Sequence, residues 1–190
     1  MNYPIVLDLE TQHKFQDVGY DVKKLKVSVV GVYDYATQQY KIYLEEELHQ
    51  LFPLLEHASL IIGFNIRKFD LPVLSPYYLG NVEQFQMVDI LEEIEKALGH
   101  RLALDDVVRA TLGVKKSGHG LLAIDYFRDG KWQELKDYCL SDVKITKELY
   151  EYGKEHGKLY YETHRGKREI PVRFQQIKQE PTAVSLSLPF

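Results

Sequence analysis

The chain has 190 residues, of which 45% are hydrophobic and 27% are charged, a composition typical of a globular protein with a sizeable core. Its net charge of −4 argues against a protein that coats nucleic acid non-specifically, although local basic patches can still bind phosphates. The single cysteine, Cys139, excludes a disulfide framework within the chain and favours a reducing compartment.

The first residues, MNYPIVLDLE, lack the basic start and the long apolar run of a secretory signal. Elsewhere in the sequence, no apolar run approaches the roughly 20 residues that a membrane-spanning helix needs. We therefore expect a cytoplasmic protein without a membrane partner.

The first half of the chain alternates strand and helix patterns. Residues 3–9, YPIVLDL, are apolar and β-branched and predict a buried strand. Two further strands are predicted at 26–35 and 38–46, and the polar turn between them predicts that they form a hairpin. Leucines at helical spacing predict a helix at 45–58, and the apolar run at 59–65 predicts a fourth strand.

The second half of the chain is mostly helical. Helical patterns are found in residues 68–80, 85–94, 103–114, 121–127 and 131–157. The second of these segments, 85–94, begins with a predicted fifth strand. Pro72 is compatible with the first of these helices only in its first turn, and Gly113 is expected to close the third. The last helix is the longest and is amphipathic.

Strands thus come first, with helices between and after them, which indicates an α/β fold with a mixed sheet. After Gly157 the pattern changes to two β-like runs around a basic turn. We predict a main domain at residues 1–157, an appended β-hairpin at 158–174 and a C-terminal tail at 175–190.

Four acidic residues stand out by their positions. Asp8 and Glu10 end the first strand, and because side chains alternate along a strand they share one side of it. Asp70 follows the fourth strand, and Asp142 lies on the long helix. Carboxylates are ligands that Mg²⁺ and Mn²⁺ prefer. Four of them can hold two ions about 3.5–4 Å apart, an arrangement that suits phosphodiester hydrolysis.

Tyr138 precedes Asp142 by four residues, so the two share a helix face. Taken alone, such a tyrosine is usually a half-buried packing residue and such an aspartate a solvated charge. The tyrosine gains interest only because the other acidic motifs precede it in order along the chain.

Three segments in order resemble the motifs of the DEDD family of 3′–5′ exonucleases: DLET at 8–11, GFNIRKFDLPVL at 63–74 and YCLSD at 138–142. The Tyr-x-x-x-Asp form of the third segment resembles the tyrosine-type (DEDDy) subgroup, because the histidine-type subgroup would place histidine where this chain has Asp137. The second segment is similar to the proofreading exonuclease domain of family B DNA polymerases. The resemblance covers roughly residues 3–150.

This resemblance implies a ribonuclease H-like fold, with a central five-stranded mixed sheet flanked by helices. It also implies that two divalent metal ions, Mg²⁺ or Mn²⁺, are held by Asp8, Glu10, Asp70 and Asp142. Tyr138 would orient the attacking water, since a phenol can position a water that a metal has acidified. Residues implied to lie beside the substrate are Leu9, Thr11, Asn65 and Phe69.

The activity implied is metal-dependent hydrolysis from the 3′ end of a nucleic acid, releasing nucleoside 5′-monophosphates. Single-stranded DNA is the favoured substrate because of the second motif. RNA is the alternative, since ribonuclease D-like members share the third motif. Two other classes stay open: a catalytically silent nucleic-acid-binding module, and a different two-metal enzyme on the same fold, such as a Holliday junction resolvase or ribonuclease H.

Three further features carry two interpretations each. His119, in the loop KKSGHG, is either a substrate contact or a capping residue. The lysines at 14, 23, 24 and 26, and HRGKR at 164–168, either supply a local positive field or form a solvated surface. The terminal SLSLPF resembles the short peptides by which bacterial replication proteins bind the sliding clamp, without their leading glutamine.

Overall fold

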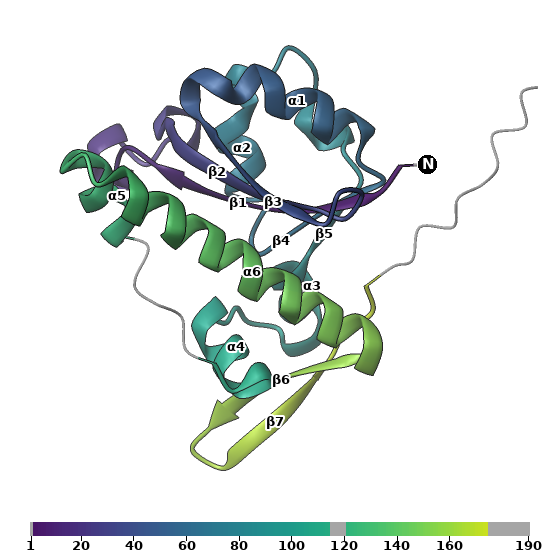
Figure 1. Cartoon of the computed structure of the whole chain (residues 1–190). Coiled ribbons are helices and arrows are strands. Elements are labelled where there is room, and N and C mark those ends of the chain that lie inside the picture. The colour runs from purple at the N-terminus through teal and green to yellow at the C-terminus, as the bar shows by residue number, and fades with distance from the viewer. Residues whose placement is uncertain (1, 115–120, 175–190) are drawn as a thin grey trace, which may run out of the picture.

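A five-stranded mixed sheet forms the centre of the molecule, in the order β3-β2-β1-β4-β5 (Figure 1). The structure is a computed structural model and describes residues 2–114 and 121–174. β1 pairs antiparallel with β2 and parallel with β4, which confirms the predicted mixed sheet. The strands are β1 (Pro4–Thr11), β2 (Val27–Asp34), β3 (Gln39–Leu44), β4 (Leu60–Gly63) and β5 (Met87–Asp89).

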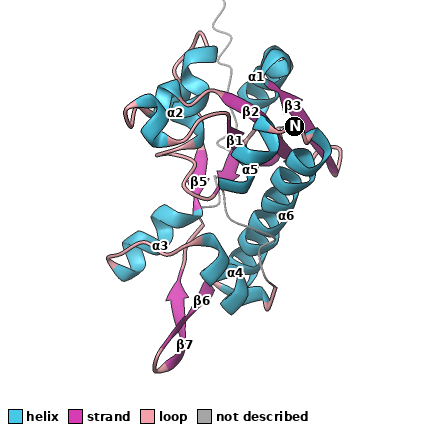
Figure 2. Cartoon of the chain, turned by 90° about the vertical axis from the view of Figure 1, so that its left-hand side faces the viewer, coloured by secondary structure: helices cyan, strands magenta, loops and turns pink. Residues whose placement is uncertain are grey.

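Helices cover both faces of this sheet. Figure 1 shows α1 and α2 on one face, and α6 with α3 and α4 on the other. In Figure 2 the hairpin of β6 and β7 projects from the end of the molecule where α3 and α4 lie. The bounds are α1 (Leu48–His57), α2 (Asp70–Leu74), α3 (Ile90–Leu98), α4 (Leu104–Leu112), α5 (Leu121–Arg128), α6 (Trp132–His156), β6 (Lys158–Thr163) and β7 (Gly166–Pro171).

The alternation of side chains along β1 determines which face of the sheet receives the carboxylates. Ile5 and Leu7 pack into the hydrophobic cluster that contains the buried residues of α1 and α2. Val6 faces the other way and packs with the cluster that contains residues of α6. Asp8 and Glu10 follow Val6 at even spacing, so their side chains project toward α6.

A glycine in β2 allows α6 to approach the sheet beside the first motif. Gly31 is the cross-strand partner of Asp8. A Cβ atom at position 31 would lie only 2.8 Å from Cγ2 of Val143 and 2.9 Å from Sγ of Cys139. The Cys139 thiol in turn donates to the backbone carbonyl of Asp8 at 3.5 Å. The absence of a side chain at Gly31 therefore sets the close strand–helix distance.

The β2–β3 turn is built around the buried carboxylate of Asp34, which is 4% exposed. It accepts hydrogen bonds from the backbone N–H of Ala36 at 2.9 Å, from the hydroxyl of Thr37 at 3.0 Å and from the ammonium of Lys41 at 2.7 Å. Burial acts to raise the pKa of Asp34, but these hydrogen bonds outweigh it and lower the pKa below its usual value.

We expect Asp34→Asn to lower the free energy of unfolding at pH 7 by about 1–3 kcal/mol, because it weakens the charge-assisted bond from Lys41. A carboxyl with a lowered folded-state pKa stabilises the protein above its unfolded-state pKa, and this contribution is lost as the pH falls through the folded-state value. Urea denaturation from pH 7 to pH 2.5, roughly spanning that range, should show the difference between the two proteins shrinking. A difference independent of pH would contradict this assignment.

The C-terminal hairpin is present as predicted and shares the main core. Leu159 and Ile170 join the buried cluster of α3, α4 and α6. The hydroxyl of Thr111 in α4 accepts from the backbone N–H of Tyr160 at 2.9 Å. The division of the chain after residue 157 stays a prediction.

Some predictions fall on segments that the structure leaves undescribed. His119 with the rest of KKSGHG, and the tail with SLSLPF, lie outside the described residues. Within residues 2–114 and 121–174, no helix has both the length and the apolar character needed to cross a membrane.

Candidate active site

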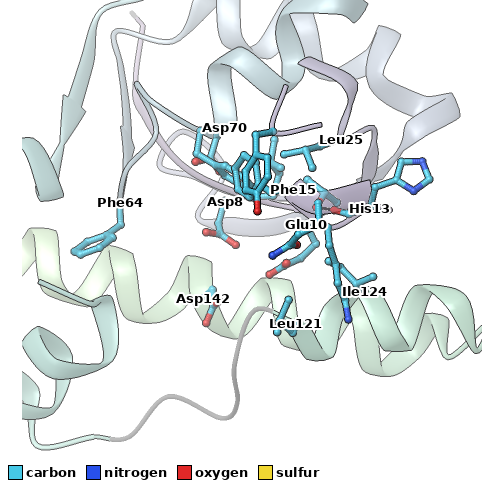
Figure 3. A pocket seen from close by; sticks show the side chains of 16 residues that line it. Asp8, Glu10, His13, Phe15, Leu25, Phe64, Asp70, Leu121, Ile124 and Asp142 are labelled. Atoms are coloured by element: carbon cyan, nitrogen blue, oxygen red, sulfur yellow. Dashed lines mark hydrogen bonds between the residues drawn. The ribbon is translucent and has the colours of Figure 1, made fainter. Parts of the chain in front are cut away.

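Three carboxylates converge where the end of β1 faces α6. Asp8, Glu10 and Asp142 each offer an oxygen, and these oxygens lie within 4.8 Å of one another. Figure 3 shows Asp8 and Glu10 projecting toward the helix that carries Asp142. Asp142 is only 2% exposed, so the mutual repulsion of the three charges is poorly screened. Oxygen donors alone, with excess negative charge, fit a hard divalent cation such as Mg²⁺ or Mn²⁺.

Asp70, the first residue of α2, lies on the wall of the same cavity but outside this group of three. Its Oδ1 accepts a hydrogen bond from the backbone N–H of Leu9 at 3.1 Å, which fixes the second motif against the first. Burial, opposed by backbone hydrogen bonds and reinforced by the charge of Asp89, raises the pKa of Asp70 to about 7. Positive charge brought close to this carboxyl would favour its ionised form.

The loop that leads to Asp70 is held by a buried aspartate at the end of β5. Asp89 caps α3 by accepting from the backbone N–H of Leu91 at 3.0 Å. It also accepts from the backbone N–H groups of Asn65 at 2.8 Å and Arg67 at 3.0 Å. Because one carboxylate organises both segments, Asp89 positions the β4–α2 loop without lining the large cavity.

The carboxylates open into a cavity of about 700 Å³. Its walls come from the end of β1, the segment after β1, the β4–α2 loop, the start of α5 and Asp142. Figure 3 shows how the labelled side chains surround it. Apart from the acidic residues, the walls are largely apolar and aromatic, through Phe15, Tyr20, Phe64, Phe69, Leu121 and Ile124.

Most of the residues predicted to lie beside the substrate line this cavity, namely Leu9, Thr11 and Phe69. Asn65 does not; its amide oxygen accepts a hydrogen bond from the guanidinium of Arg101, beside a smaller cavity next to α3. Asn65 also has a left-handed backbone, with φ of 68°, which turns the chain between β4 and α2. Of the lysines near the first motif, Lys14 lines the large cavity.

Tyr138 lies next to the acidic group but is packed away from the cavity. It is 5% exposed and belongs to a buried cluster with Val29 of β2 and Ala123 of α5. It shares the face of α6 with Asp142, as its spacing predicts. It does not line the large cavity, because α5 covers that part of α6.

The sequence motifs missed several residues of the cavity wall. Phe15 and Tyr20 follow the first motif, and Phe64 precedes the Asn65 of the second. The signal in the sequence was a pair of aromatic residues five positions apart, Phe15 and Tyr20, with a glycine directly before the second. The pair begins four residues after the end of β1. Its meaning depends on the turn at Gly19, which brings the two rings together.

The model of the RNase_H superfamily matches residues 5–153, from the start of β1 nearly to the end of α6. The chain belongs to the RNase_H superfamily. The mixed sheet with its flanking helices is thus the ribonuclease H-like fold that the sequence motifs implied. Membership of the RNase_H superfamily supports a metal-dependent nuclease, and the cluster of Asp8, Glu10 and Asp142 is where a metal ion could bind.

Among solved structures, this RNase_H superfamily member is similar to the family B DNA polymerase from the hyperthermophilic archaeon Pyrobaculum calidifontis. The TM-score is 0.61 and the identity 19%, over 79% of this chain and 24% of the polymerase chain. The chain therefore spans about a quarter of the polymerase's length, and at this identity the likeness shows the fold alone. No curated protein matches the chain.

Proposed function

We propose that this protein is a 3′–5′ exonuclease that hydrolyses phosphodiester bonds at the 3′ end of single-stranded DNA and releases nucleoside 5′-monophosphates. The observation that carries this proposal is the convergence of Asp8, Glu10 and Asp142 within 4.8 Å, in a chain of the RNase_H superfamily. The order of the DLET, FNIRKFD and YCLSD motifs along the chain supports the hypothesis of a tyrosine-type exonuclease.

Two divalent ions, Mg²⁺ or Mn²⁺, are the proposed cofactors. Asp8, Glu10 and Asp142 would hold them, with Asp70 on the wall of the same cavity as a fourth carboxylate. When bound, such ions supply activated water and stabilise the leaving oxygen of a phosphodiester. The protein's own part is to hold the carboxylates in place, through the Leu9 N–H bond to Asp70 and the packing of α6 on β2.

DNA is proposed ahead of RNA for two reasons. The second motif resembles that of the family B polymerases, and the fold is similar to a solved family B DNA polymerase. RNA stays the second candidate because the third motif is shared with ribonuclease D-like enzymes; a protein distinguishes RNA from DNA by contacts to the 2′-hydroxyl.

The test uses oligonucleotides of DNA and RNA, each labelled once at the 5′ end and once at the 3′ end, with Mg²⁺, with Mn²⁺ and with EDTA. We expect a ladder of shortened 5′-labelled strands, and immediate release of label from 3′-labelled strands, only with metal. Shortening of RNA but not of DNA would show that RNA is the substrate. Binding without shortening of either polymer would instead support a silent binding module and overturn the proposal.

Tyr138→Phe tests the role proposed for the tyrosine, which is to orient the attacking water, although the ring lies under α5 rather than on the cavity wall. The variant keeps the buried ring among Val29 and Ala123 but removes the hydroxyl. We expect the rate of hydrolysis to fall about 100-fold or more, from the lower end of the usual range for a group that assists proton transfer. Affinity for Mg²⁺, measured by calorimetry, should change little because all four carboxylates remain. An unchanged rate would exclude the water-orienting role.

A further inference from the structure

Two aromatic rings stand exposed on the wall of the acidic cavity. Phe15 is 39% exposed and Tyr20 is 70% exposed, and both line the cavity that contains Asp8, Glu10 and Asp142. The two rings are nearly parallel, with an interplanar angle of 18° and centroids 6.5 Å apart. Exposed apolar surface that adjoins a polar site is typical of a binding surface.

A third ring extends this surface toward the acidic residues. The ring of Phe69 lies 5.9 Å from that of Phe15, centroid to centroid. Phe69 is followed directly by Asp70, which lines the same cavity. The aromatic surface is therefore continuous with the carboxylate-bearing part of the cavity.

The backbone holds the exposed ring of Tyr20 in place at a conformational cost. Gly19 and Tyr20 both have left-handed backbone conformations, each with φ of 64°, and this region is unfavourable for a residue with an aromatic side chain. The N–H of Tyr20 donates to the carbonyl of Phe15 at 2.8 Å, which closes the turn. Strain of this kind persists where surrounding contacts over-determine it, and it is frequent at binding sites.

Ion pairing anchors the same segment to α5, across the cavity wall. Asp17 accepts from the backbone N–H of Lys14 at 3.1 Å and from the guanidinium of Arg128 at 2.7 Å. α5 also contributes Leu121 to the cavity. The turn that carries Phe15 and Tyr20 is thus held by a backbone hydrogen bond between its two ends and by the ion pair of Asp17 with Arg128 of α5.

We propose that Phe15 and Tyr20 form a stacking platform for the bases of a single strand whose 3′ end enters the acidic cavity. The platform rests on the proposed function, and it makes that function selective for unpaired nucleotides. Every nucleobase has a π-face, so stacking on aromatic rings is tolerant of sequence. Within a duplex those faces are already stacked on neighbouring base pairs. Lys14, on the same cavity wall, supplies positive charge for a backbone phosphate.

The experiment measures the affinity of the full chain for a fluorescent dT oligonucleotide, in EDTA so that nothing is hydrolysed. A strand of equal length whose sugars carry no bases is the second probe. Tyr20→Ala and Phe15→Ala are each expected to weaken binding of the dT strand about five- to twentyfold, in the lower part of the range for a stacked base. Binding of the abasic strand should change less than twofold. Tyr20→Phe should restore the affinity, because it restores the ring.

Tyr3→Ala is the matched control, since Tyr3 is 46% exposed but precedes β1 at the end opposite to the carboxylates. It should leave both affinities unchanged. Equal weakening for base-bearing and abasic strands, or no weakening in either variant, would overturn the platform. Metal-dependent shortening by the wild type, measured in parallel, separates that result from a failure of the exonuclease proposal. If the wild type neither binds nor shortens nucleic acid, both proposals fall together.

Discussion

Replacing Asp8 with asparagine is expected to abolish metal-dependent shortening of nucleic acid. Asp8 lies within the group of three carboxylates with Glu10 and Asp142, so the change removes a proposed metal ligand while keeping the shape of the side chain. Loss of a residue that hydrogen-bonds to a metal ligand typically lowers metal affinity or activity about 10–100-fold. A ligand itself should cost more than about 100-fold in rate.

The same substitution has a second expected result, which separates a metal ligand from a structural residue. Without metal, the three clustered carboxylates repel one another. Asp8→Asn should therefore leave the melting temperature in EDTA unchanged or raise it. Mg²⁺ should raise the melting temperature of the wild type, because a ligand that binds only the folded state stabilises it, and should raise that of the variant less.

Asp137→Asn is the matched control for Asp8→Asn. Asp137 immediately precedes Tyr138 on α6, but it is exposed and accepts a hydrogen bond from Gln133. It should leave the rate, and the response of the melting temperature to Mg²⁺, unchanged. If Asp137→Asn lowered the activity as much as Asp8→Asn does, the overall negative charge of this region, rather than the group of three carboxylates, would govern the reaction.

Gly31→Ala is expected to damage both stability and activity, although residue 31 does not line the cavity. Its new Cβ would lie 2.8 Å from Cγ2 of Val143 and 2.9 Å from Sγ of Cys139. Both neighbours are fully buried, so α6 must shift outward. We expect a loss of about 1–3 kcal/mol in the free energy of unfolding, as for other overpacked cores. Asp142, on the same helix, would move away from Asp8.

Urea denaturation and the rate of shortening measure the two effects. Gly31→Ala combined with Val143→Ala supplies the control, because the second change removes the methyl group that the new Cβ meets. In a double-mutant cycle the two losses in unfolding free energy should sum to more than the loss of the double variant. Purely additive losses, or a full rate in Gly31→Ala, would show that position 31 does not set the strand–helix distance.

Local patterns in the sequence were sufficient for much of the fold. The predicted strands and helices correspond to β1 through β7 and to α1 through α6. Pro72 lies in the first turn of α2, and Gly113 closes α4 with a left-handed φ of 74°. These features depend on side-chain alternation, helical spacing and backbone preference, which act over a few residues.

That Asp8 and Glu10 share one side of β1, and that Tyr138 and Asp142 share one face of α6, could be predicted from the sequence, because both statements follow from the period of a single element. How close these two faces come depends on tertiary packing. That distance depends on Gly31, more than 100 residues from Asp142 in the sequence.

Tertiary packing also sets the surroundings of the site. α5 covers Tyr138, Arg101 binds the side chain of Asn65, and the turn at Gly19 brings Phe15 beside Tyr20. The first contact joins two consecutive helices, the second joins residues that are 36 positions apart, and the third depends on a left-handed backbone at Tyr20. Packing between separate elements produces no periodic pattern in the sequence. The motifs therefore identified the acidic residues, whereas the residues of the cavity wall were found only in the folded structure.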